Sequence, residues 1–143
     1  MLNRRGFISC AICSAMGYAA TEAAAQGTPQ AAAPAAPSGI TRTVLGKSEL
    51  PGDRYVVILM EAEFDPALKV ARHTHPGVES SYLIAGGGVL SVKGQADRTL
   101  KAGEAFQIPA EVPHAFQVGA EKTKLAITYA VDKDKPLATP APE

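Results

Sequence analysis

The sequence of 143 residues contains no tryptophan and only two cysteines, Cys10 and Cys13. Both lie in an N-terminal segment that reads as a targeting signal, so their C-x-x-C spacing does not predict a redox site. Acidic and basic side chains balance to a formal net charge of zero, and the basic stripe that nucleic-acid binding requires is missing. The apolar run at residues 7–20 is too short to span a bilayer comfortably. We therefore expect a globular protein that meets small molecules rather than nucleic acids.

The first 25 residues have the form of a secretory signal peptide. Arg4 and Arg5 precede the apolar run, and small residues lead to Ala25, after which we expect cleavage. The arginine pair resembles a twin-arginine export signal, although Asn3 and Ser9 replace the usual Ser and Lys. An ordinary general-secretion signal is the alternative. Either signal predicts a periplasmic or secreted protein that keeps no stable membrane anchor after cleavage.

The remaining chain divides by composition into a linker, a domain and a tail. Residues 26–38 are almost entirely small residues, Gln and Pro, which predicts a flexible Ala/Pro-rich linker. Residues 132–143 alternate charge and proline, which predicts a disordered tail. Between them, residues 39–131 contain ten of the chain's 13 glycines and show short apolar runs with turn signals between them. No stretch has a sustained helical period, so this domain is predicted to be an all-β sandwich or barrel.

The three histidines of the chain fall inside this domain, together with a well-placed glutamate. His73 and His75 are two residues apart in a predicted strand, so their side chains share one face. Glu79 starts the next predicted strand and His114 opens a later one. Three imidazoles and a carboxylate suit one divalent transition metal (Fe, Mn, Co, Ni, Cu or Zn) better than Ca or Mg. Four protein ligands would leave a coordination position open, as catalytic sites do. The alternative is a solvated H-x-H on an edge strand.

These residues resemble the two sequence motifs of the cupin family. The first motif is met by His73-Thr74-His75, three residues, Glu79, six residues and Gly86. The second is met by Gly103, five residues, Pro109-Ala110-Glu111, two residues and His114. Three positions depart from the family pattern: Ala67 and Glu111 stand where the family has glycine, and Val118 stands where it has asparagine. None of the three is a metal ligand in the family.

The resemblance implies a double-stranded β-helix, the jelly-roll-like cupin barrel, that holds its metal through His73, His75, Glu79 and His114. It also implies a homodimer. The activity that we expect is that of an exported, metal-dependent oxidoreductase similar to small dioxygenases, acting on a small organic molecule. Glu79 would be either a ligand throughout or a base. A metal-dependent isomerase or lyase, and a non-enzymatic periplasmic module that binds a small molecule or metal, remain open alternatives.

Further residues of the pocket follow from strand parity. Ser81 and Leu83 share a face with Glu79, and Phe116 and Val118 share one with His114. An enzyme needs a second functional group beside the metal, and the sequence offers few. The candidates are Tyr82, Arg98, Glu111 and Tyr129, while Phe106 is a second aromatic residue that could cover the pocket.

Overall fold

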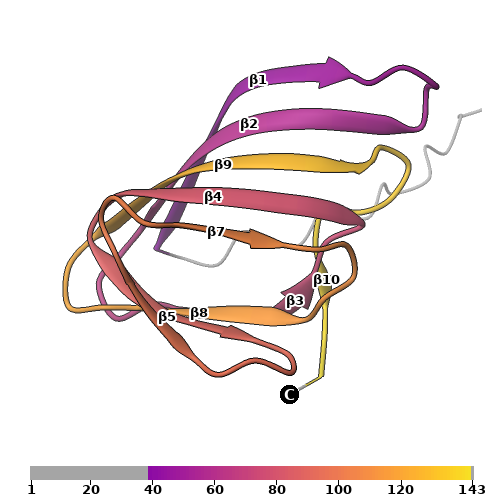
Figure 1. The fold of residues 1–143 in the computed structure, drawn as a ribbon. Helices are drawn as coiled ribbons and strands as arrows, with labels where there is room; N and C mark the ends of the chain where they lie inside the picture. The colour runs from indigo at the N-terminus through magenta and orange to yellow at the C-terminus, as the bar shows by residue number, and fades with distance from the viewer. Residues whose placement is uncertain (1–38, 143) are drawn as a thin grey trace, which may run out of the picture. The chain divides into compact units, whose positions relative to one another are not determined.

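The computed structural model describes residues 39–142, so the predicted signal peptide and linker lie outside the described residues. Two five-stranded antiparallel sheets face each other (Figure 1). The first has the order β1 (Ile40–Glu49), β2 (Tyr55–Phe64), β9 (Thr123–Asp132), β4 (Gly77–Ala85) and β7 (Ala105–Ile108). The second has the order β10 (Thr139–Pro140), β3 (Lys69–Thr74), β8 (His114–Val118), β5 (Gly87–Val92) and β6 (Arg98–Lys101). The predicted fold class, an all-β double-stranded β-helix, is confirmed.

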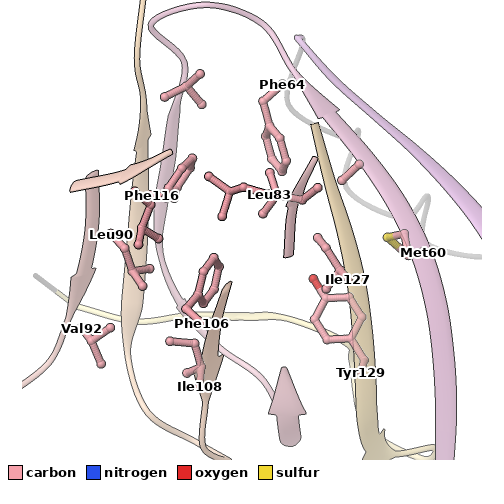
Figure 2. Packing of buried hydrophobic residues seen from close by; sticks show 14 of the residues in the cluster. Met60, Phe64, Leu83, Leu90, Val92, Phe106, Ile108, Phe116, Ile127 and Tyr129 are labelled. Carbon is pink, nitrogen blue, oxygen red and sulfur yellow. The ribbon is translucent and has the colours of Figure 1, made fainter. Parts of the chain in front are cut away.

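The core lies between the two sheets because inward and outward residues alternate along each strand. In β9 every second side chain is buried, and β2 pairs with it without a break from Tyr55 opposite Asp132 to Phe64 opposite Thr123. Figure 2 shows how aromatic and aliphatic side chains from both sheets meet in the middle. The buried side chains of this core include Phe64, Leu83, Phe106, Phe116, Ile127 and Tyr129. None of the residues from 39 to 142 belongs to a helix that could cross a membrane.

Two of the three departures from the family pattern, those at the motif glycines, fall at turns with left-handed backbone. Ala67 has φ 60° and Glu111 has φ 61°, a region that costs a residue with a side chain about 1 kcal/mol. Each turn is fixed by hydrogen bonds: the Ala67 amide donates to the Gly119 carbonyl (2.8 Å), and the Glu111 amide donates to the His75 carbonyl (2.9 Å). The chain thus keeps the turn geometry although the glycines are absent.

The C-terminal segment differs from the prediction. A disordered tail was expected over residues 132–143, yet β9 includes Asp132 and residues 133–142 run along the domain. In β10, Thr139 pairs with Thr74 of β3, and the Ala141 amide donates to the Arg72 carbonyl (3.0 Å). Leu137 packs against the core. The segment supplies partners for the edge of β3, whose backbone groups would otherwise be unpaired, and composition alone does not reveal this.

Candidate metal centre

The four residues predicted as ligands lie together between the two sheets. His73 is in β3 and pairs across the ladder with His114 in β8, His75 follows β3 directly, and Glu79 is in β4 of the opposite sheet. Their ligand atoms all lie within 4.8 Å of one another. Glu79 Oε2 is 2.9 Å from His75 Nε2 and 3.3 Å from His114 Nε2. The predicted grouping of these side chains is therefore present, and three of the four are buried.

The three imidazoles are oriented by the peptide backbone. Each ring places Nδ1 at hydrogen-bonding distance from a carbonyl oxygen, and the pairs are His73 with Ala71 (2.8 Å), His114 with Val112 (3.0 Å) and His75 with Leu137. Because a carbonyl only accepts, Nδ1 must carry the proton in each ring. A neutral imidazole of this tautomer has a free lone pair on Nε2. This arrangement, with the outer nitrogen donating to a carbonyl, is the one that metal-bound histidines adopt.

The charge states of the cluster also suit a cation. Burial raises the pKa of Glu79, but hydrogen-bonding contacts from His114, His75 and Ser81 outweigh it and hold the pKa well below its usual range. The Ser81 hydroxyl donates to Oε1 (2.6 Å), which leaves Oε2 directed at the imidazoles. Burial lowers the pKa of His73 to about 4. Near neutral pH, an ionised carboxylate thus faces a neutral His73 ring.

One buried atom tests whether a metal fits. His75 Nε2 has no hydrogen-bond partner among the described residues, although it lies 2.9 Å from Glu79 Oε2. With Nδ1 as the donor to Leu137, Nε2 of a neutral His75 ring presents a lone pair to a carboxylate oxygen, and two acceptors at that distance repel each other unless a proton or a cation lies between them. A divalent transition metal bound by both atoms removes the conflict and satisfies the set of three nitrogens and one oxygen. The residues therefore fit the group.

A small cavity of about 50 Å³ adjoins the cluster. Its walls are mostly apolar and include Phe64, Phe106 and Phe116. Two further polar side chains reach it besides the cluster, those of Arg42 and Tyr129. Figure 2 shows the Tyr129 hydroxyl directed into the interior. Burial, and then the charge of Glu79, raise the pKa of the Tyr129 phenol, so it stays protonated and can donate a hydrogen bond.

The other candidates from the sequence divide between interior and surface. Ser81 contacts Glu79, and Phe106, Phe116 and Tyr129 line the cavity, whereas Leu83 and Val118 belong to the core. Tyr82 points outward and is 49% exposed, and neither Arg98 nor Glu111 lines the cavity.

Sequence reasoning missed Arg42. Its partner across the β1–β2 ladder is Ala62, which is buried, so Arg42 lies on the inward face of β1. The alternation of Ile40, Arg42 and Val44 was the signal that could have placed it there.

The comparisons with known proteins agree with this architecture. The family model described as cupin domain matches residues 60–130. Among curated proteins, no sequence matches the chain. A solved RmlC-like cupin from Shewanella frigidimarina is 23% identical, with coverage of 67% of this chain and 79% of that one and a TM-score of 0.55. A double-stranded β-helix protein from Klebsiella pneumoniae is 18% identical, with coverage of 76% and 89% and a TM-score of 0.57.

A DMSP lyase from Ruegeria pomeroyi is also similar, at 19% identity and a TM-score of 0.56. The alignment covers 59% of this chain and 43% of the lyase, so this chain spans less than half of the lyase's length. Identities this low speak for the fold alone and leave the reaction open.

Proposed function

We propose that this chain, which carries a cupin domain over residues 60–130, is a metal-dependent enzyme that acts on a small organic molecule. Dioxygenase-like oxidoreductase chemistry is the first candidate. One observation carries the proposal. Three imidazoles, each held by a backbone carbonyl, and one carboxylate converge beside a mostly apolar cavity. A structural metal site is normally closed by its ligands, whereas this cluster adjoins space that a second molecule can enter.

His73, His75, Glu79 and His114 would hold one divalent ion of Fe, Mn, Ni, Cu or Zn. When bound, the ion would supply Lewis acidity and, for a redox-active metal, electron exchange with substrate and dioxygen. The aromatic walls would exclude water and strengthen electrostatic interactions inside the cavity. Ser81 would keep Glu79 in its orientation through the 2.6 Å hydrogen bond to Oε1.

Tyr129 is the best candidate for a general acid among the residues that line this cavity. Its phenol stays protonated near neutral pH, and it lies beside Glu79, which contributes to its raised pKa. The phenol could donate to an oxygen atom of the substrate. This proton donor is the specific observation that favours a second candidate, a metal-dependent lyase or isomerase, because both reactions move a proton.

Metal content tests the proposal directly. Purified without chelator, the wild-type protein should hold close to one divalent transition metal per chain, measured by mass spectrometry. His114→Ala should lose most of it, because a ligand is removed. Arg98→Gln is the matched control, since Arg98 is exposed on β6 away from the cavity. A folded His114→Ala variant that keeps the wild-type metal content would contradict the ligand assignment. For the metal-loaded wild type, consumption of dioxygen during turnover would distinguish an oxidoreductase from a lyase or isomerase.

Export and dimerisation belong to the proposal as well. The sequence features of residues 1–25 support secretion into the periplasm, which N-terminal sequencing of the protein from a periplasmic fraction would test. Exposed apolar side chains of the first sheet support a homodimer: Leu45, Leu59, Tyr82 and Ile84. Sedimentation as a monomer at micromolar concentration would argue against the dimer.

A further inference from the structure

Arg42 occupies an unusual position for a charged residue. It lies on the inward face of β1, opposite Ala62, and its side chain helps to line the cavity beside the cluster. Ala62 is fully buried and small, which leaves room for a long side chain to extend over it from the edge strand. Arg42 nevertheless remains exposed to solvent. It therefore stands where the cavity meets water.

No described residue neutralises Arg42. Between residues 39 and 142 it has no hydrogen bond and no ion pair, whereas Arg54 on the far side of the β1–β2 turn contacts Asp132 (3.3 Å). Its charge is nevertheless felt in the cavity, because it opposes the rise in the pKa of the Tyr129 phenol. A guanidinium without a partner at the mouth of a cavity is free to bind an incoming anion.

The charges around the cavity add up to an excess of positive charge once a metal is bound. A divalent ion carries +2, Glu79 carries −1, and Arg42 carries +1, while an imidazole that binds the ion through Nε2 adds no charge. The sum is +2 in a cavity with mostly apolar walls. Such a field attracts anions and repels cations, and the apolar walls strengthen it.

We propose that Arg42 is the residue that recognises the substrate's negative charge, and that the substrate is a small organic acid; this inference rests on the metal-dependent function proposed above. The carboxylate pairs with the guanidinium, whose planar fork matches it with two hydrogen bonds. A short apolar segment lies between the aromatic walls, and an oxygen atom at the other end faces the histidines and Glu79. The volume of about 50 Å³ restricts the enclosed part to a few non-hydrogen atoms.

The test measures ligand binding rather than turnover. The full chain is loaded with Zn²⁺, which has no redox chemistry, and titrated calorimetrically with glycolate, 3-hydroxypropionate and 4-hydroxybutyrate and with their uncharged amides. The expected result for the wild type is that at least one acid binds roughly 10- to 100-fold more tightly than its amide, as a charged hydrogen-bonded pair predicts. Arg42→Gln should abolish this preference, and Arg42→Lys should keep part of it. Arg98→Gln, which removes an exposed arginine outside the cavity, should leave it unchanged.

The outcomes separate the two proposals. If the wild type binds Zn²⁺ but binds acids no better than amides, or if Arg42→Gln keeps the preference for acids, the role of Arg42 is overturned while the metal site stands. The second result would mean that the metal alone attracts the carboxylate. If the wild type binds no metal, the proposed function itself fails. Zinc content and circular dichroism of each variant ensure that an effect on binding is not an effect on folding or metal loading.

Discussion

Deletion of the C-terminal segment should weaken metal binding although the segment contains none of the proposed ligands. A chain that ends at Lys135 lacks Leu137, whose carbonyl accepts the hydrogen bond from His75 Nδ1. Without this acceptor the ring can rotate and its tautomer is no longer fixed. Loss of such an outer partner typically costs 10- to 100-fold in metal affinity, or about 1.4 to 2.7 kcal/mol.

The deletion also removes the Leu137 side chain from the edge of the core, and this second effect needs its own control. Leu137→Ala keeps the carbonyl and removes most of the side chain, so it should lower thermal stability by about 1 kcal/mol with little change in metal affinity. Competition for Zn²⁺ against a chromophoric chelator gives the affinity, and thermal unfolding with excess chelator gives the stability. Equal affinities of the deletion variant and the wild type would refute the reasoning, and so would an equal loss in Leu137→Ala.

Three further predictions concern backbone strain, the hydroxyl in the cavity and pH. Ala67→Gly should stabilise the protein by about 0.5 to 1 kcal/mol in chemical denaturation, because glycine tolerates the left-handed φ of 60°. The control Ala71→Gly in β3 should destabilise it. A loss of stability in Ala67→Gly would contradict the inference that the backbone at residue 67 is strained. Tyr129→Phe should keep the metal content and lower turnover of a substrate that needs a proton, by roughly 100-fold or more; unchanged turnover would remove the phenol from the mechanism. The metal-free protein should lose stability as pH falls from about 6.5 towards 4, because burial lowers the folded-state pKa of His73 to about 4 and the unfolded chain therefore binds the proton first. Thermal melts of the metal-free wild type and His73→Gln across that range would test this, since the variant should show a smaller pH slope.

The grouping of the four proposed ligands could be predicted from the sequence because they fall in two motifs whose internal spacing resembles that of the cupin family. His73 and His75 share a strand face, Glu79 opens the next strand, and His114 follows a proline turn, so strand parity and motif spacing bring them to one region. The strands themselves were predictable for the same reason, because inward and outward residues alternate along them.

What could not be predicted depends on contacts between distant segments. Arg42 comes to the cavity through the pairing of β1 with β2, and no local pattern reveals how far its side chain reaches. The tail looked disordered because its composition is polar and rich in proline, yet Leu137 and β10 find partners at the edge of β3. Tyr129 was recognised as an aromatic candidate but could not be placed until the register of β9 against β4 was known.

The use of backbone carbonyls to orient all three imidazoles has a consequence for mutational tolerance. The accepting oxygens belong to Ala71, Val112 and Leu137, and every amino acid carries the same carbonyl. Point substitutions at these three positions can therefore leave the orientation of the rings intact. Insertion or deletion of a residue shifts the carbonyl itself. A scan of this protein for metal binding should accordingly find these segments permissive to changes of residue type and intolerant of changes of length.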